Sequence, residues 1–326
     1  MIIAVDAMGG DQGPVTTVPA VVAFLKRHPD VRICLYGDAR ELRIAGDCDG
    51  RLRVVDCHQR LDADERPAQA LRHKRESGLW YALEAVAQGN ASACVSGGDT
   101  GSLMAMAIAT IGMLPGLVRP AICTQLPTAP GGQVGLLDLG ANVDCSAELL
   151  HQFARMGAAR LLATGQGMPP RVALLNIGAE AGKGNRAVKA AAALLEADET
   201  LHYIGFVEAD QVLLGQADLV VCDGFVGNVA LKSIEGVARL LLARLRQSAG
   251  KSPWRRWLLR PPLRSALSFL DPAQYNGASL LGLRGVVVKS HGAADVAGFG
   301  HALLAAHTEA QGRLPERVAA RLAGRC

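Results

Sequence analysis

The sequence predicts an α/β protein whose sheet is mostly parallel and carries one hairpin excursion. Three observations lead to this fold class. Apolar runs rich in β-branched residues recur along the 326 residues, as is typical of strands covered on both faces. Segments with apolar residues at helical spacing follow most of these runs. Four runs end abruptly at polar, glycine-rich clusters that begin near residues 96, 176, 222 and 289. Ligands of parallel α/β sheets bind just beyond such strand ends, so we expect one convergent cleft.

The amino-terminal part alternates strands and helices. Strands are expected at 2–5, 31–36, 52–55 and 93–95, and helices at 15–27, 78–88 and 102–111. The first helix is indicated by Val18, Val21, Val22 and Leu25, which recur at helical spacing. The stretch 57–77 is polar and densely charged, and we expect a long loop there.

A hairpin interrupts this alternation between residues 121 and 139. The runs 121–126 and 134–139 are joined too briefly for a crossover helix, and Gly131 and Gly132 supply a turn. The two strands are therefore expected to pair antiparallel. Such a hairpin would mark a second lobe or an arm that contacts a second subunit.

The remaining elements continue the α/β pattern. Helices are expected at 146–163, 186–196, 228–247 and 294–310, and strands at 171–177, 202–207, 219–222 and 286–289. No internal repeat or low-complexity linker divides the chain. We therefore expect residues 1–326 to form a single catalytic unit, either as one lobe or as two lobes that share the sheet.

Composition and charge restrict the class of function. Charged residues make up 20% of the chain with both signs dispersed, aromatic residues make up 4%, and the formal net charge is +4. These values argue against a disordered chain and against a base-stacking surface for nucleic acid. Arg313, Arg317, Arg321 and Arg325 repeat every four residues, which is typical of a solvated stripe on a terminal helix.

The sequence also indicates a compartment. Residues 1–6 contain no basic segment and meet an aspartate early, so no signal peptide is expected. No uncharged apolar stretch reaches the roughly 18 residues that span a bilayer. The eight cysteines form no Cys-x-x-Cys pair, and no His-Glu-x-x-His motif is present. We expect reduced thiols, a cytoplasmic protein and no metal site.

Residue types in the glycine-rich loops favour an anionic ligand. Glycines let backbone amides approach a ligand, and amides at the start of a helix carry partial positive charge. Lys183, between Gly182 and Gly184, adds a mobile ammonium that suits phosphate. The alternative for Lys183 is a solvent-exposed lysine in a flexible loop.

Several further positions have two interpretations each. Asn228 stands at the expected start of the long helix, where its amide either caps the helix or faces the cleft. Lys232, one turn on, belongs either to the cleft or to the surface. His291 is either a general acid or a structural histidine near a strand end. Asp6 and Asp138 either bind a polar ligand or bond to their own backbone.

Seven motifs, in order along nearly the whole chain, match a known family. They are Asp-Ala-Met-Gly-Gly-Asp at 6–11, Arg-Pro-Ala at 119–121, Leu-Asp-Leu-Gly-Ala-Asn at 137–142, Leu-Leu-Asn-Ile-Gly at 174–178, Cys-Asp-Gly-Phe-Val-Gly-Asn at 222–228, Tyr-Asn-Gly-Ala at 275–278 and Lys-Ser-His-Gly at 289–292. By these motifs the chain resembles the bacterial phosphate acyltransferases of the PlsX family, which make acyl phosphate from acyl carrier protein and inorganic phosphate.

The resemblance implies a homodimer with a three-layer α/β sandwich, like that of isocitrate and isopropylmalate dehydrogenases and of phosphate acetyltransferase. It associates the positions of Lys183 and Asn228 with the active site, and we add His291 as a third catalytic candidate. The substrate-binding candidates come from the same loops: Asp6, Gly9, Gly10, Ser96, Gly98, Asp99, Thr100, Gly101, Asn142, Asn176, Gly178, Asp223, Gly227, Lys289 and Ser290. No Gly-x-Gly-x-x-Gly fingerprint follows a strand, so no cofactor is expected.

The reaction that the resemblance implies needs little proton transfer. Phosphate is already anionic at neutral pH, and a thiol leaves as a thiolate, so positioning and charge dominate. Lys183 and the loop amides would hold phosphate, Asn228 or an adjacent amide would stabilise the tetrahedral oxyanion, and His291 would assist the leaving sulfur.

Two positions depart from the family pattern. Relatives typically have asparagine where this chain has Asp99, and a pair of acids where it has Ala179 and Glu180. An aspartate at position 99 would add negative charge near the phosphate and weaken phosphate binding. If Asp99 faces the cleft, activity should be impaired and Asp99→Asn should restore it.

The segment 251–270 is expected to be peripheral and amphipathic. It begins with basic and apolar residues that suit the headgroup boundary of an anionic membrane: Trp254, Arg255, Arg256, Trp257 and Leu258. There a labile acyl phosphate would pass to the downstream membrane acyltransferase that the resemblance implies. The alternative is a helix end that packs on its dimer mate.

Two other functions stay open at this point. The same fold carries short-chain acyl transfer between coenzyme A and phosphate, and the preferred donor distinguishes that activity. Asp99 and the segment at 254–258 suggest, in turn, a catalytically weakened scaffold that recruits lipid-synthesis partners to the membrane.

Overall fold

The computed structural model describes residues 1–42, 48–62, 65–165, 168–248 and 272–324. Within them the strands are β1 (Ile2–Asp6), β2 (Arg32–Gly37), β3 (Leu52–Asp56), β4 (Ala93–Ser96), β5 (Ala121–Pro127), β6 (Gln133–Leu137), β7 (Arg171–Leu175), β8 (His202–Val207), β9 (Leu219–Val221), β10 (Ala278–Leu281) and β11 (Val286–Lys289). The helices are α1 (Pro14–Arg27), α2 (Pro67–His73), α3 (Gly78–Ala87), α4 (Thr100–Thr110), α5 (Ala147–Ala163), α6 (Arg186–Glu196), α7 (Gly224–Ser248), α9 (Val296–Gln311) and α10 (Leu314–Leu322), with short 3-10 turns η1 (Val212–Leu214) and η2 (Pro272–Tyr275).

These strands form one sheet in the order β3-β2-β1-β4-β11-β10-β5-β6-β9-β7-β8. The five strands from β3 to β11 are parallel to one another, and so are the four from β6 to β8. Between them, β10 pairs antiparallel with both β11 and β5, and β5 pairs antiparallel with β6. The α/β prediction is confirmed, and β5 and β6 form the hairpin expected at 121–139.

The two parallel groups run in opposite directions, which the sequence did not predict. Three antiparallel pairings separate β11 from β6. Neighbouring strands also twist by roughly 20–25°, so the five steps from β4 to β9 add roughly 100–125°. The carboxyl ends of the two groups therefore do not converge through a shared strand direction, which was the basis of the expected single cleft.

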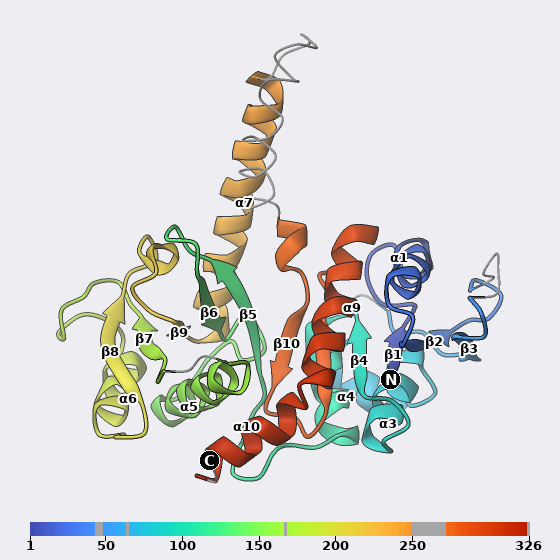
Figure 1. The fold of residues 1–326 in the computed structure, drawn as a ribbon. Helices are drawn as coiled ribbons and strands as arrows, with labels where there is room; N and C mark the ends of the chain where they lie inside the picture. Colours follow the sequence, from blue (N-terminus) through green and yellow to red (C-terminus); the bar gives the residue numbers. More distant parts are fainter. Residues whose placement is uncertain (43–47, 63–64, 166–167, 249–271, 325–326) are drawn as a thin grey trace.

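Helices cover both faces of the sheet and make three layers (Figure 1). On one face, α3, α4 and the first part of α7 pack on Ala4, Cys94 and Val220. The other face carries α1 and α9 over Ile3 and its neighbours, and α5, α6 and α10 over strands of the second group. Successive strand residues thus serve opposite cores, as a sheet buried on both sides requires.

The long helix α7 differs from the others in its placement. Its first part packs against β6 and η2, and the rest projects away from the sheet and its helices (Figure 1). Val237, Leu240 and Leu241 are exposed on this projecting part. Apolar surface left exposed by the described residues in this way is typical of a surface that binds something else.

Three elements differ from the sequence-based expectation. The expected loop at 57–77 contains α2, a seven-residue helix with Pro67 in its first turn and only Ala70 fully buried. The four-residue strand β10 was not expected, because its Ser279 is polar yet buried. Helix α7 begins at Gly224, four residues before Asn228. The charged sequence around α2 and the short length of β10 explain why these two elements were not predicted.

Candidate active site

The loops after β1 and β4 are joined by a buried carboxyl group. Asp6 is 5% exposed, and its Oδ2 accepts a hydrogen bond from the Ser96 hydroxyl at 2.7 Å. The backbone N–H of Gly98 donates to the same hydroxyl oxygen at 3.0 Å, and that of Met8 donates to Asp6 Oδ1 at 3.3 Å. Burial raises the pKa of Asp6, although these bonds oppose the shift. Asp6 and Ser96 therefore hold the two loops together.

Glycines at these strand ends are required by close packing. A side chain at Gly9 would come within 3 Å of Asp6 Oδ2 and of the Gly98 nitrogen. Gly10 has a φ of +95°, in the left-handed region that favours glycine. The backbone N–H of Asp11 donates to the carbonyl of Gly292 at 2.8 Å. The loops after β1, β4 and β11 thus form one compact cluster.

Asp99 caps helix α4. Its Oδ2 accepts a hydrogen bond from the backbone N–H of Ser102 at 2.7 Å, as an N-cap side chain does. Thr100 and Gly101 form the first turn, where Gly101 packs beside Pro67 of α2. The carboxylate that departs from the family pattern therefore has a structural role, and an asparagine could make the same bond.

Lys289, at the end of β11, is a lysine held in a largely desolvated place. Its ammonium donates to the carbonyl of Gly97 at 3.4 Å and to that of Ser290. Burial lowers its pKa to about 8, which the carboxylates of Asp99, Asp11 and Asp6 partly oppose. A lysine perturbed in this way at a cluster of strand ends is typical of a functional site.

The next two residues, Ser290 and His291, are fixed by Asn276, which follows η2. The Asn276 amide donates to Ser290 Oγ at 2.9 Å and accepts from the backbone N–H of His291 at 2.8 Å. Ser290 is fully buried, whereas the His291 side chain reaches the surface. Desolvation and the ammonium of Lys232 lower the pKa of His291. His291 is therefore positioned and mostly neutral near pH 7.

Lys232 of α7 is the residue that the sequence left undecided. Its Nζ lies 2.5 Å from Nε2 of His291 and 3.3 Å from Oε2 of Glu235. The contact links α7, which follows β9, to the cluster at β1, β4 and β11. The only signal in the sequence was the helical spacing of Lys232 from Asn228, which gives no contact with a residue 59 positions away.

A second cluster follows β6, around Asp138. Its carboxylate accepts hydrogen bonds from the backbone of Ile122 at 2.8 Å and from the backbone and side-chain amides of Asn142 at 2.7 and 2.9 Å. Asn142 Oδ1 in turn accepts from Arg119 Nε at 2.6 Å. Burial raises the pKa of Asp138. Asn142 is 3% exposed, so this network orders the loop from within.

The start of α7 lies against this second cluster. Asp223 Oδ1 accepts from the backbone N–H of Val226 at 2.8 Å and so caps the helix. A side chain at Gly227 would collide with the carbonyl of Asp138. Asn228, inside the helix, is exposed and lies beside Gly140. The capping interpretation of Asn228 is therefore wrong, because Asp223 performs that role and leaves the Asn228 amide facing outward.

Lys183 extends from a loop that Asn176 organises. The side-chain amide of Asn176 donates to the carbonyls of Gly178 and Lys183 at 3.1 and 3.3 Å. Asn185 then caps α6 by accepting from the backbone N–H of Val188 at 2.9 Å. Across the part of the chain described, we find no hydrogen bond or ion pair for the exposed Lys183 ammonium. Since β7 adjoins β9, this loop neighbours the strand end that leads to Asn228.

The structure thus gathers the predicted residues into two groups. One, at β1, β4 and β11, contains the residues from Asp6 to Gly10, from Ser96 to Gly101 and from Lys289 to His291. The other, at β6, β9 and β7, contains Asn142, Asn176, Gly178, Lys183, Asp223, Gly227 and Asn228. Helix α7 connects them through Lys232. Trp254, Arg255, Arg256, Trp257 and Leu258, and the whole segment 251–270, lie outside the described residues.

Large apolar side chains are exposed beside the second group. Val143 follows Asn142, Ile177 follows Asn176, and Phe225 lies in the first turn of α7; they are 67%, 79% and 61% exposed. Each belongs to the loop or turn after one of the neighbouring strands β6, β7 and β9. The polar loops of this group are therefore accompanied by apolar surface.

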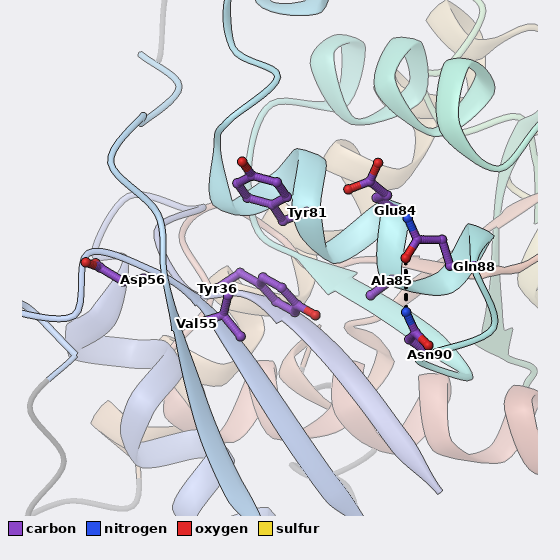
Figure 2. A pocket seen from close by; sticks show the side chains of 8 residues that line it. All are labelled: Tyr36, Val55, Asp56, Tyr81, Glu84, Ala85, Gln88 and Asn90. Carbon is purple, nitrogen blue, oxygen red and sulfur yellow. Dashed lines mark hydrogen bonds between the residues drawn. The ribbon is translucent and has the colours of Figure 1, made fainter.

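A cavity of about 250 Å³ lies elsewhere, between α3 and the outer strands β2 and β3 (Figure 2). Tyr36 and Tyr81 line it together with Glu84, Gln88 and Asn90, and Asn90 donates to Gln88 Oε1 at 3.0 Å. Its lining mixes phenols, amides and carboxylates without a cation. Lys289, whose pKa is lowered, and Asn228, which does not cap α7, lie instead at the glycine-rich loops.

The described ranges lack two features. No helix there is long and apolar enough to cross a membrane. No three histidine, cysteine, aspartate or glutamate side chains in these ranges are grouped so that they could hold a metal ion.

Known proteins similar to this chain agree on one family. A family model described as "Fatty acid synthesis protein" matches residues 1–317. The phosphate acyltransferase of Pseudomonas syringae pv. tomato is 51% identical over 330 residues, covering 98% of this chain and 96% of the relative. That of Vibrio vulnificus is 45% identical over 328 residues, with the same two coverages of 98% and 96%.

Solved structures show the same fold in more distant proteins. A phosphotransacetylase from Streptococcus pyogenes matches with a TM-score of 0.63 at 17% identity, covering 95% of this chain and 94% of that one. A branched-chain phosphotransacylase from Enterococcus faecalis matches with a TM-score of 0.60 at 15% identity, covering 95% and 99%. The family model and the close relatives both span nearly the whole sequence. The chain therefore belongs to the phosphate acyltransferase (PlsX) family of enzymes, which transfer an acyl group to phosphate.

Proposed function

We propose that this acyltransferase takes a long-chain fatty acyl group from acyl carrier protein and transfers it to inorganic phosphate, giving acyl phosphate for phospholipid synthesis. The observation that carries the long-chain donor is the exposed apolar surface of Val143, Ile177 and Phe225 beside Asn228. Burying an acyl chain against such side chains is favourable by about 0.8 kcal/mol for each methylene group. A short acyl group gains little from this surface.

In the proposed mechanism a phosphate oxygen attacks the thioester carbonyl. A bond forms between that oxygen and the acyl carbon, the carbon–sulfur bond breaks, and the thiolate leaves with the electron pair. The Lys183 ammonium and loop amides hold phosphate. Asn228 donates to the oxyanion of the tetrahedral intermediate, since its side-chain amide is not used to cap α7. His291 donates one hydrogen bond, either to the departing sulfur or to phosphate.

Lys289 supports this mechanism by adding a positive charge at the first group of loops. With a pKa of about 8 it carries a proton in most molecules at pH 7. The carbonyls of Gly97 and Ser290 hold that ammonium in place. Asp99 caps α4, so this position has a structural role whether or not it also affects phosphate.

The donor is tested with the purified protein, phosphate and a set of thioesters. We expect acyl phosphate from long-chain acyl carrier protein at a higher kcat/KM than from short-chain acyl-CoA. Phe225→Ser should raise KM for the long-chain donor and leave that for a short-chain donor nearly unchanged. Leu304→Ser, at an exposed apolar position of α9, is the matched control. A preference for short-chain acyl-CoA would instead assign a phosphate acetyltransferase-like activity.

We further propose that the enzyme is a cytoplasmic homodimer that associates peripherally with the inner face of the cell membrane. The exposed Val237, Leu240 and Leu241 on the projecting part of α7 support a partner surface there. The segment 251–270 is the membrane contact in this proposal, near the downstream membrane acyltransferase. Sedimentation with anionic vesicles tests the membrane part, and light scattering tests the dimer. Failure to bind anionic lipid would leave the alternative of packing on a dimer mate.

A further inference from the structure

The side chains of Lys232 and His291 bring two nitrogen atoms into close contact, and one of the two must accept a hydrogen bond for the contact to be favourable. The ammonium nitrogen of Lys232 lies 2.5 Å from Nε2 of His291, closer than a normal hydrogen bond. A lysine ammonium has three donors and no acceptor. The contact is therefore favourable only if Nε2 of the imidazole accepts, and the other side of the ring decides whether it can.

A backbone hydrogen bond to the other ring nitrogen makes Nε2 a donor and not an acceptor. Nδ1 of His291 accepts a hydrogen bond from the backbone N–H of Ala293 at 3.1 Å. The loop is held in place, since Asn276 accepts from the His291 N–H and Ala294 N–H donates to the His291 carbonyl. A neutral imidazole carries its proton on one nitrogen only. With Nδ1 accepting, the proton is on Nε2, which is then a donor.

Two donors consequently face each other with no acceptor between them. Among the described residues, the carboxylate that contacts this pair is that of Glu235. Glu235 Oε2 lies 3.3 Å from Lys232 but is shared with Arg239 at 2.9 Å. On the other side stands the Lys289 ammonium, faced by Asp99, Asp11 and Asp6. An anionic oxygen that accepts from both nitrogens would relieve the opposed donors, because hydrogen bonds between a cation and an anionic oxygen are strong.

We propose that Lys232 and His291 form a two-donor subsite for a phosphate-type oxyanion, one oxygen of which accepts from both Nζ and Nε2. This inference rests on the proposed function for the identity of the anion, which is inorganic phosphate. The oxygen would stand about 2.8 Å from each nitrogen, so Lys232 moves back from His291 as the anion enters. Lys232 is then a binding residue of the site, and Ala293 is a positioning residue that sets the imidazole tautomer.

The experiment measures binding of inorganic phosphate by calorimetry without any acyl donor. Lys232→Met should weaken binding by about 10- to 100-fold, the factor that corresponds to one hydrogen bond to a charged group. Lys232→Arg should retain most of the affinity. The matched control is Arg239→Met, which removes the same charge from the same helix without a contact to His291. That control should change the affinity by no more than about two-fold, because exposed charges interact weakly through water.

A second measurement follows the imidazole itself. Proton-detected ¹⁵N spectra should show His291 as the Nε2–H tautomer, and phosphate should shift its Nε2 signal in the wild type and not in Lys232→Met. His291→Gln, which keeps an amide donor, should bind phosphate better than His291→Phe. Thermal unfolding of each variant separates loss of binding from loss of fold.

The outcomes distinguish this inference from the proposed function. Equal phosphate affinity in the wild type and Lys232→Met, or equal losses in Lys232→Met and Arg239→Met, would overturn the subsite even if the wild type makes acyl phosphate. If phosphate binds in a Lys232-dependent way but no thioester yields acyl phosphate, the function fails and the subsite stands. If Lys232→Met raises only KM for the carrier thioester, the oxyanion held is a phosphodiester of that donor.

Discussion

The hydroxyl of Ser96 donates to the carboxylate of Asp6 at 2.7 Å, across 90 residues of sequence. The same oxygen accepts from the backbone N–H of Gly98. One small side chain thus joins the ends of β1 and β4 and orders the loop between β4 and α4. Both residues were candidate ligands in the sequence, and their contacts make them supports of the loops that carry the site.

Ser96→Ala should destabilise the protein by about 1–3 kcal/mol, because it leaves a buried carboxyl group and a backbone N–H without their partner. Urea denaturation gives the change in the free energy of unfolding. Ser92→Ala, at an exposed position before β4, is the control and should stay within about 0.5 kcal/mol of the wild type. Equal stability of the two variants would show that the bond to Asp6 contributes nothing.

Asn228→Ala should lower kcat by about 100- to 1000-fold, the usual cost of losing one oxyanion donor. Stability should hardly change, because Asp223 and not Asn228 caps α7. Steady-state kinetics with phosphate and a long-chain donor measures the effect. Ser233→Ala, an exposed neighbour on α7, should turn over normally. Near-normal turnover of purified Asn228→Ala would refute its assignment.

Asp99→Asn should bind phosphate a few-fold more tightly at pH 7, since a negative charge near the site is removed. Because asparagine is as good an N-cap as aspartate, the stability of the variant should match that of the wild type, whereas Asp99→Ala should lose about 1 kcal/mol. Calorimetry and urea denaturation give the two quantities. Unchanged phosphate affinity would mean that Asp99 acts on α4 alone.

Lys289→Met should be more stable than the wild type near pH 7 but much less active. The pKa of Lys289 falls from 10.5 in the unfolded chain to about 8 in the fold. Between these values the unfolded chain binds more protons, so wild-type stability rises with pH there, by roughly 3 kcal/mol in all. The advantage of Lys289→Met should therefore shrink between pH 8 and pH 10.5. Denaturation at pH 7, 9 and 10.5 checks this, and a constant difference would contradict it.

Glu309→Gln should destabilise the protein by about 3–5 kcal/mol, because Arg160 would keep a buried charge without a partner. Arg160 of α5 and Glu309 of α9 are both 8% exposed and form an ion pair of 3.1 Å, and Ser279 donates to the same carboxylate. Replacing both by Arg160→Met with Glu309→Leu should restore most of the loss. If the double variant is no more stable than Glu309→Gln, the pair itself, and not the stranded charge, stabilises the fold.

Local signals in the sequence were sufficient for most of the fold. Helix α6 was predicted at 186–196 with the bounds that the structure has, because its apolar spacing is regular and Asn185 caps it. The reversed direction of the second strand group could not be predicted, since it depends on which strands pair across β10 and β5. β10 itself is four residues long and buries Ser279 against Glu309, a partner 30 residues away.

The candidate site divides in the same way. Glycine at 9, 10 and 227 and polar residues at strand ends mark the loops, and these signals are local. Whether Asn228 or Asp223 caps α7 depends on where the helix begins, and propensity does not fix such a boundary to within a few residues. Lys232 meets His291 only because a helix from one half of the sheet crosses to the strand ends of the other.

Helix α7 also works as a rod. Its 25 residues measure about 37 Å, with Gly224 packed at the inner end and Lys232 about 12 Å along. A sideways shift of about 3 Å at the far tip, pivoting at Gly224, would displace Lys232 by about 1 Å. Such a displacement supplies part of the separation that an entering oxygen needs beside His291. A partner that binds the outer turns of α7 would therefore change the distance between Lys232 Nζ and His291 Nε2.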